Sequence, residues 1–306
     1  MIIPKMKIAI VAPGGCAVDE DGVARAVERL TAAGCTVHNY YDAAAKFQRF
    51  GGTDAARLEQ LNAAAANPDV QVVMALRGSY GISRLLPQID FAAMAASGKI
   101  FVGYSDFTAF HMGLLARTGV KSYAGPMICD DYTREEADSF TLTNFAACLA
   151  GPSHAVHGSG AGNPALDVEG TVWGGNLSML THLAGTEYFA QVDGGILFVE
   201  DVNEHPYRVE RMLLQLLHMG VLARQKALVL GEISAYRLGP NENGYDFEAM
   251  LAFLRQHLPI PVLTGLQFGH VRTRVTIPFG AHARLECDGD AFTMTMTDYP
   301  TLTDAI

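Results

Sequence analysis

The sequence has little positive charge, no paired cysteines and no long apolar run, and each absence excludes a class of protein. Lysine and arginine number 22 against 32 aspartates and glutamates, a formal net charge of −10, so we expect no nucleic-acid-binding surface. The five cysteines are scattered and include no C-x-x-C pair, which argues against a disulfide framework or a zinc site. We therefore expect reduced thiols and no metal.

Motifs for targeting and for nucleotide binding are also missing. Residues 1–7 contain no signal-peptide core with a cleavage site, and no apolar run reaches about 18 residues, so we expect neither secretion nor a membrane span. The sequence contains no G-x-G-x-x-G, no G-x-x-x-x-G-K-[ST] and no H-E-x-x-H. These absences predict a cytoplasmic protein that needs no cofactor and contacts neither nucleic acid nor membrane.

Apolar runs alternate with segments of helical spacing through the first half of the chain. Such alternation is typical of right-handed βαβ units and a parallel sheet. We therefore predict an α/β fold whose N-terminal domain is flavodoxin-like or Rossmann-like. The expected strands are residues 7–12, 37–40, 70–76 and 100–103, and the expected helices are residues 21–33, 54–66 and 135–150.

The composition changes after residue 150. Residues 151–165 are rich in glycine, serine and proline, which predicts a linker between two domains. We therefore expect a nucleophile domain over residues 1–150 and a smaller C-terminal α/β domain over residues 166–306. In the second domain we expect strands over residues 169–173, 196–199, 227–230 and 261–263, helices over 177–184, 207–219 and 247–258, and a β-hairpin over 284–296.

The segment around Ser105 combines a strand, a tight turn and a helix. Residues 100–103 have strand character, and from Asp106 the apolar spacing is helical until Gly119. A serine on such a turn is typical of a nucleophile elbow, where the hydroxyl stands above the sheet beside free helix N–H groups. The alternative is a helix N-cap, which serine and aspartate both favour. The segment also lacks the second glycine of G-x-S-x-G.

A serine hydroxyl needs a base, usually a histidine that an acidic group orients. Of the ten histidines, His270 follows a glycine in a loop, and His205 precedes a proline at a helix start. Both are candidates for the base, and a solvated loop histidine is the alternative. Glu200 ends an apolar strand, where an unpaired carboxylate is costly, although an ion pair with a nearby arginine is the alternative role. Asp201 and Glu232 are the other candidate acids.

A series of short motifs follows one another along nearly the whole chain. They are L-R-G-S-Y-G from residue 76, R-L-L-P-Q-I-D from 84, G-Y-S-D-F-T from 103, G-P-M from 125, W-G-G-N-L from 173, E-D-V-N-E-H-P-Y-R from 200 and T-G-L-Q-F-G-H from 264. In this order they resemble the LD-carboxypeptidase family, most closely the murein tetrapeptide carboxypeptidases of cell-wall recycling. Each motif alone is weakly specific, and their shared order carries the resemblance.

The resemblance implies a serine peptidase in which Ser105 is the nucleophile, His270 is the general base and Glu200 orients the histidine. It also implies that the serine lies in the N-terminal domain, the other two residues lie in the C-terminal domain, and the active site lies between them. The implied reaction is hydrolysis of an L,D-peptide bond through an acyl-enzyme, which releases terminal D-alanine from a murein tetrapeptide.

The resemblance further implies an oxyanion hole formed by backbone N–H groups of Asp106 and of the Gly78-Ser79 turn. This chain departs from the family there, because Ser79 stands where the family commonly has a second glycine. If the position requires a positive φ, the turn is strained.

The substrate of such an enzyme carries a free carboxylate beside the scissile bond. Arg77, Arg272 and Arg274 are candidates to bind it, and Asn176 is a further candidate for substrate binding. We expect a muropeptide substrate and a homodimer. One alternative is the microcin-immunity branch of the family, which cleaves a peptide–nucleotide conjugate and is expected to present an aromatic residue to the base. The other is a non-catalytic, two-lobed small-ligand-binding protein, for which an export signal is expected.

Overall fold

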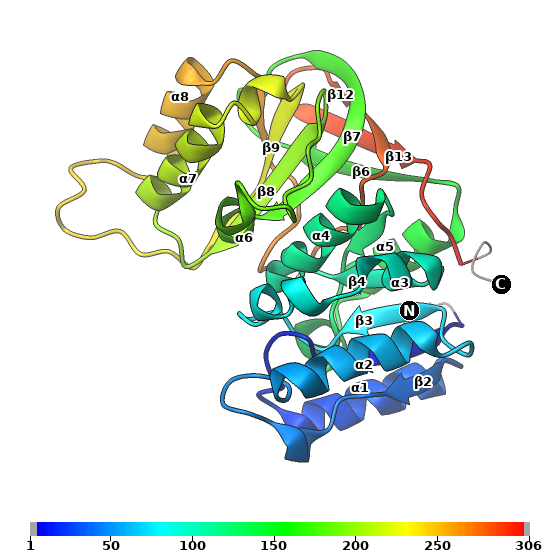
Figure 1. Ribbon diagram of the computed structural model, residues 1–306. Coiled ribbons are helices and arrows are strands. Elements are labelled where there is room, and N and C mark those ends of the chain that lie inside the picture. Colours follow the sequence, from blue (N-terminus) through cyan, green and yellow to red (C-terminus); the bar gives the residue numbers. More distant parts are fainter. Residues whose placement is uncertain (1–4, 303–306) are drawn as a thin grey trace.

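A largely parallel sheet forms the lower part of the molecule in Figure 1. The computed structural model describes residues 5–302. The strands of this sheet are β1 (Lys7–Val11), β2 (Thr36–Asn39), β3 (Val72–Ala75), β4 (Ile100–Gly103), β5 (Ser122–Ala124) and β11 (Ile277–Phe279). Their order is β11-β5-β4-β3-β1-β2, and only β11 is antiparallel to its neighbour. Without β11 this is the 2-1-3-4-5 order of flavodoxin-like sheets, which confirms the predicted fold class.

Helices connect these strands, and polar side chains start most of them. They are α1 (Glu20–Ala32), α2 (Asp54–Ala66), α3 (Phe91–Ala96), α4 (Thr108–Thr118) and α5 (Ser139–Ala150). The capping side chains that accept a free N–H of the first turn are Asp19, Thr53, Asp90 and Asp138. At the end of α4, Gly119 adopts a left-handed conformation with φ 71°, as expected for a helix-terminating glycine.

A second, mixed sheet forms the upper part of the molecule (Figure 1). Its strands are β6 (Ser153–Ser159), β7 (Leu166–Asn176), β8 (Ile196–Val202), β9 (Ala227–Ser234), β10 (Val262–Thr264), β12 (His282–Cys287) and β13 (Ala291–Thr297), in the order β10-β9-β8-β7-β12-β13-β6. Strands β7 to β10 are parallel, and β12 and β13 form the predicted hairpin. The helices of this part are α6 (Leu177–Leu183), α7 (Pro206–His218) and α8 (Phe247–His257).

Helix α7 shows how the hydrophobic pattern positions an element. Its predicted apolar stripe packs inward, with Val209, Leu213 and Leu216 fully buried. Removing such side chains from water is the main favourable contribution to packing the helix on the sheet. The stripe leaves the N-terminus of α7 beside the carboxyl end of β8, at the edge of the sheet where ligands of α/β proteins usually bind.

Three strands, β5, β6 and β11, differ from the sequence-based expectations. Residues 151–165 were predicted to be a linker, but Ser153–Ser159 form β6, which pairs with β13 along its full length. His154 and Val156 are buried in it, so both His154 and His157 lie in a strand. The glycine- and serine-rich composition conceals this strand, because its stability comes from pairing with a strand more than 130 residues away. Strands β5 and β11 were not predicted either, and β11 returns the chain to the first sheet beside β5.

Within residues 5–302, no helix is both long enough and apolar enough to cross a membrane. Residues 1–4, on which part of the expectation about the N-terminus rests, lie outside the described residues.

Candidate active site

Ser105 lies on the turn between β4 and α4, and its backbone is left-handed with φ 62°. This conformation is costly for a residue with a side chain, and such strain gathers at functional sites. A 3₁₀ turn, η4 (Ser105–Phe107), leads from the serine into the helix. Gly103 permits the sharp turn, because a Cβ atom there would lie 2.7 Å from Cγ of Phe107. The predicted strand–turn–helix arrangement is therefore present.

The side chains of Ser105, His270 and Glu200 form a continuous hydrogen-bonded chain. His270 Nε2 lies 2.9 Å from Ser105 Oγ, and His270 Nδ1 lies 2.7 Å from Glu200 Oε2. Glu200 is fully buried near the carboxyl end of β8. Its carboxylate can only accept at Nδ1, which makes Nδ1 the protonated nitrogen and leaves Nε2 free to accept the serine proton. The fold brings the histidine to a serine that is 165 residues away in the sequence.

Asn176 holds the carboxylate of this chain in place. Its Nδ2 donates to Glu200 Oε1 at 3.1 Å, and its Oδ1 caps α6 by accepting the N–H of Met179. Its backbone N–H donates to Thr108 Oγ1 at the start of α4, at 3.1 Å. The structure therefore places this residue, expected to bind substrate, between the acid and the helix that begins next to the serine.

The imidazole of His270 is positioned by the groups on either side of it. The preceding Gly269 has φ 144°, and a Cβ atom there would lie 3.1 Å from Glu200 Cβ, so glycine allows the close approach. The Tyr104 ring meets the histidine ring edge-on, with centroids 5.2 Å apart. Arg274 in turn stacks its guanidinium 4.3 Å from the Tyr104 centroid.

The competing candidates have other partners. His205 is the N-cap of α7, where its Nδ1 accepts the N–H of Tyr207 at 3.3 Å. Asp201 accepts the N–H and the hydroxyl of Ser178, at 2.8 and 2.7 Å, and burial raises the pKa of its carboxyl. Glu232 is exposed to solvent. Of the candidate bases and acids, only His270 and Glu200 lie in the chain that reaches the serine.

The backbone of Gly78 lies directly against the serine. A Cβ atom on this glycine would lie 2.7 Å from both Cβ and Oγ of Ser105, and 3.5 Å from the backbone nitrogen of Asp106. The two segments expected to supply oxyanion donors are therefore neighbours. This closeness is compatible with the predicted oxyanion hole, which needs donors from both segments near the reacting carbonyl.

Ser79 has φ 66°, so the turn has the positive φ at which a residue other than glycine is strained. The Ser79 side chain also forms a contact that glycine could not make, because its Oγ accepts a hydrogen bond from Arg49 Nη2 at 2.6 Å. The turn thus keeps the backbone course that glycine would allow, at a conformational cost of about 1–2 kcal/mol for a residue with a side chain.

We expect Gly78→Ala to lower kcat/KM by roughly 10- to 100-fold, because the added methyl displaces either the serine or the turn, and small misplacements are costly in catalysis. Steady-state kinetics would measure the loss. Ser79→Gly in the same turn is the matched control and should keep most of the activity. Equal activity in Gly78→Ala and the parent protein would show that this backbone does not contact the reacting groups.

The carboxyl group of Asp106 links the turn that holds Ser105 to the segment that follows the Gly78 turn. Sequence reasoning missed this feature. Asp106 is buried, and its Oδ2 accepts the N–H of Ile82 at 2.9 Å, just beyond the Gly78 turn. From the other side, the buried Arg57 donates to Gly81 O at 3.0 Å. Burial raises the pKa of the Asp106 carboxyl from 3.8 to about 7. The motif named the residue, but its burial depends on packing that no local pattern reveals.

This raised pKa predicts how stability varies with pH. Because the folded-state pKa is about 7 and the ordinary value is 3.8, the stability gained from protonated Asp106 is complete below pH 3.8 and is lost as the pH rises to about 7. Asp106→Asn removes this dependence. Between pH 5 and pH 8 we expect the parent to lose about 2.5 kcal/mol of stability relative to the variant, because part of the effect is already lost between pH 3.8 and pH 5. Thermal melts of both proteins across this range would measure the difference, and a constant difference would contradict the assigned pKa.

The three arginines considered for binding the substrate carboxylate differ in how many of their guanidinium nitrogens already have a protein partner. Arg274 is buried and forms an ion pair with the equally buried Asp131, so it is part of the core beneath Tyr104. Arg77 and Arg272 each donate to a backbone carbonyl, at 3.1 and 3.3 Å, and Arg272 is exposed. These two keep guanidinium nitrogens for another partner.

The described part of the chain contains no group of three or more His, Cys, Asp or Glu side chains that could hold a metal ion. Its five cysteines are all free thiols.

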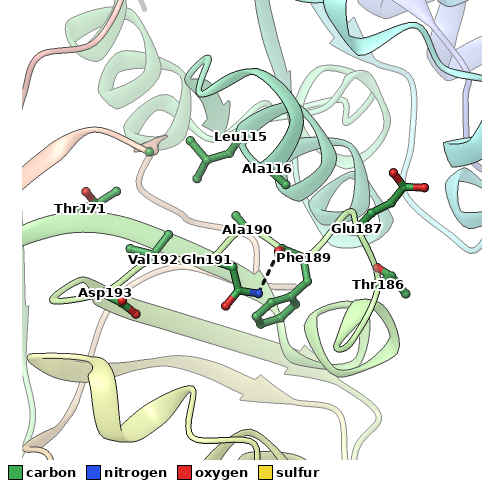
Figure 2. A pocket seen from close by; sticks show the side chains of 11 residues that line it. Leu115, Ala116, Thr171, Thr186, Glu187, Phe189, Ala190, Gln191, Val192 and Asp193 are labelled. Atoms are coloured by element: carbon green, nitrogen blue, oxygen red, sulfur yellow. Dashed lines mark hydrogen bonds between the residues drawn. The ribbon is translucent and has the colours of Figure 1, made fainter.

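A separate cavity of 620 Å³ lies between α4 and residues 186–193 (Figure 2). Leu115 and Ala116 of α4 form one wall, and Gln191 on the other side donates from Nε2 to Phe189 O at 3.4 Å. None of the residues of the hydrogen-bonded chain lines this cavity, so it is not part of the candidate active site.

Comparison with known proteins identifies the family. Residues 8–125 match the LD-carboxypeptidase N-terminal domain, and residues 169–285 match the LD-carboxypeptidase C-terminal domain. The chain is 31% identical to the murein tetrapeptide carboxypeptidase of Pseudomonas aeruginosa, over 92% of this chain and 93% of that protein. It is 28% identical to the microcin C7 self-immunity protein of Escherichia coli, over 80% of this chain and 79% of that protein.

A solved structure agrees with these matches. The muramoyltetrapeptide carboxypeptidase of Oxalobacter formigenes is 50% identical, and it superimposes with a TM-score of 0.93 over 96% of this chain and all of that chain. Structures of the microcin immunity protein at 22–24% identity share the fold. The chain therefore belongs to the LD-carboxypeptidase family of serine peptidases.

Proposed function

We propose that this protein hydrolyses the L,D-peptide bond of murein tetrapeptides and releases the terminal D-alanine, through an acyl-enzyme on Ser105. The observation that carries the proposal is the hydrogen-bonded chain from Ser105 Oγ to His270 Nε2 at 2.9 Å and from His270 Nδ1 to Glu200 Oε2 at 2.7 Å. This connectivity supports the activation of a hydroxyl nucleophile by a histidine that a buried acid orients.

In the acylation step, Ser105 Oγ attacks the carbonyl carbon of the scissile bond while His270 Nε2 takes the hydroxyl proton. Glu200 stabilises the resulting imidazolium through its hydrogen bond to Nδ1. Backbone N–H groups of Asp106 and of the Gly78 turn stabilise the negative charge that develops on the carbonyl oxygen. The strained backbone of Ser105, with φ 62°, supports a hydroxyl that is held in place before substrate arrives.

The tetrahedral intermediate then collapses. His270 gives its proton to the nitrogen of the leaving D-alanine, and the shortened peptide remains as an ester on Ser105. A water molecule that is deprotonated by the same imidazole attacks the ester and releases the tripeptide. Proton transfer in both halves of the reaction needs the histidine to lie between the serine and the acid, as it does here.

The choice of a murein peptide as substrate is supported by two relatives. The Pseudomonas protein is a murein tetrapeptide carboxypeptidase, and the Oxalobacter protein, at 50% identity, is a muramoyltetrapeptide carboxypeptidase. The microcin immunity protein is the main competing relative, at 28% identity.

The test is incubation of the protein with free murein tetrapeptide and, separately, with a peptide–nucleotide conjugate, followed by mass spectrometry. We expect loss of one alanine from the tetrapeptide and little change in the conjugate. Preferential cleavage of the conjugate would assign the protein to the microcin-immunity function. A serine-directed phosphonate should label Ser105, and failure to label it together with no cleavage would indicate a binding protein.

A further inference from the structure

A cavity of 710 Å³ opens where β8 and β9 end, between the start of α7 and the loop after β9. In Figure 1 this loop, drawn in yellow, extends outward beyond α7. Aromatic rings form part of the cavity wall. The rings of His205 and Tyr207 lie 4.6 Å apart between centroids, and Tyr236 lies 6.5 Å from the same histidine. The Tyr207 side chain is 45% exposed, so a ligand in the cavity can pack against it.

Both strands reach the cavity through strained residues. Asn203 follows β8 with φ 63°, and Ala235 follows β9 with φ 58°, and both line the cavity. The two strand ends are joined there, because the N–H of Asn203 donates to Ser234 O at 2.8 Å. A left-handed alanine is costly and persists only where the surrounding structure imposes it, which is typical of binding sites.

The cavity adjoins the candidate active site. Ser234 Oγ donates to the backbone carbonyl of His270 at 3.4 Å, and the next residue lines the cavity. Asn203, the residue after β8, lies three residues beyond Glu200, a distance of about 10 Å in extended chain. The cavity is thus linked through neighbouring residues to both Glu200 and His270, the two residues that are hydrogen-bonded behind Ser105.

The charged side chains around the cavity leave one cation without a partner. Glu242 Oε1 lies 3.2 Å from His205 Nε2, and Arg208 lies 3.5 Å from Glu204. Arg237 is exposed and has no hydrogen bond or ion pair with any residue from 5 to 302. An arginine next to an aromatic wall suits a carboxylate on an otherwise apolar stem.

We propose that this cavity binds a carboxylate of the substrate that is remote from the scissile bond, with Arg237 as its ion-pair partner and Tyr207 packing against the adjoining peptide. The inference rests on the proposed function. In a murein tetrapeptide the glutamate is joined through its side-chain carboxyl, so its α-carboxylate is free. This group lies one residue before the residue whose carbonyl is attacked, in the part of the substrate that stays on the enzyme when D-alanine leaves.

The experiment compares two tetrapeptides that differ only in this group, one with the free α-carboxylate and one with its amide. For the parent protein we expect the KM of the carboxylate substrate to be about tenfold lower. Arg237→Gln should raise that KM about tenfold, leave kcat within about twofold, and leave the amide substrate unaffected. Arg237→Lys should recover part of the difference. Arg224→Gln, which removes an exposed arginine bound to Asp193, is the control and should change neither substrate.

Each outcome decides a separate question. If the parent cleaves both peptides equally well and Arg237→Gln changes neither, the inference is wrong and the proposed function stands. An equal loss on both substrates would show that Arg237 supports the fold of the loop and does not bind the carboxylate. If Arg237→Gln changes neither tetrapeptide but lowers cleavage of a peptide–nucleotide conjugate assayed in parallel, the inference is wrong and the cavity binds a nucleotide. If the parent cleaves no tetrapeptide at all, the proposed function fails first, together with the inference built on it.

Discussion

Ser105→Ala is expected to reduce kcat by roughly 10⁵- to 10⁶-fold, the order seen when the nucleophile of a serine protease is removed. The variant has no hydroxyl to form the acyl-enzyme, and His270 Nε2 loses its partner at 2.9 Å. Any remaining rate would come from substrate binding and oxyanion stabilisation alone. Release of D-alanine over hours, followed by mass spectrometry, would measure it.

The same substitution should have little effect on folding. Alanine and serine bear a similar cost at φ 62°, and the serine is only partly buried, so the free energy of unfolding should change by no more than about 1 kcal/mol. Thermal melts provide this control. Substantial residual activity combined with a loss of several kcal/mol would mean that Ser105 is a structural helix cap and that another residue is the nucleophile.

Glu200→Gln is expected to lower kcat by roughly 10²- to 10⁴-fold, by analogy with the triad acid of serine proteases. The substitution keeps the size of the side chain, but its amide nitrogen can donate to His270 Nδ1. The proton then moves to Nε2, where it blocks acceptance of the serine proton. The charge that stabilises the imidazolium is lost as well. Kinetics at a single pH would measure the fall.

Asp201→Asn and Glu232→Gln are the matched controls for this prediction. Asp201 accepts both hydrogen bonds of Ser178 at the start of α6, so its replacement should affect stability more than kcat. Glu232 is exposed, and its replacement should have little effect on either. Near-parental kcat in Glu200→Gln, with collapse in either control, would transfer the role of the acid to that residue.

Much of the fold could be predicted because its signals are local. The strand before Ser105, the glycine that ends α4 and the stripe on α7 each follow from spacing and residue type over a few turns. Strands β5, β6 and β11 were missed for the opposite reason. Their segments are short or polar, and each is stabilised by pairing with a strand far away in the sequence.

By itself, the sequence determined the α/β class, the strand–turn–helix around Ser105 and, through the order of its motifs, the family. Residue patterns alone left two histidines and three acids open as partners of the serine. The tertiary structure decided which of them meet, because hydrogen bonds of 2.7 and 2.9 Å join Glu200 of the second sheet, through a loop histidine, to the serine that follows a strand of the first sheet. It also decided that Asn176 holds the acid and that Asp106 is buried between the elbow and the Gly78 turn. Burial and long-range contact depend on how whole elements pack, and no local pattern encodes them.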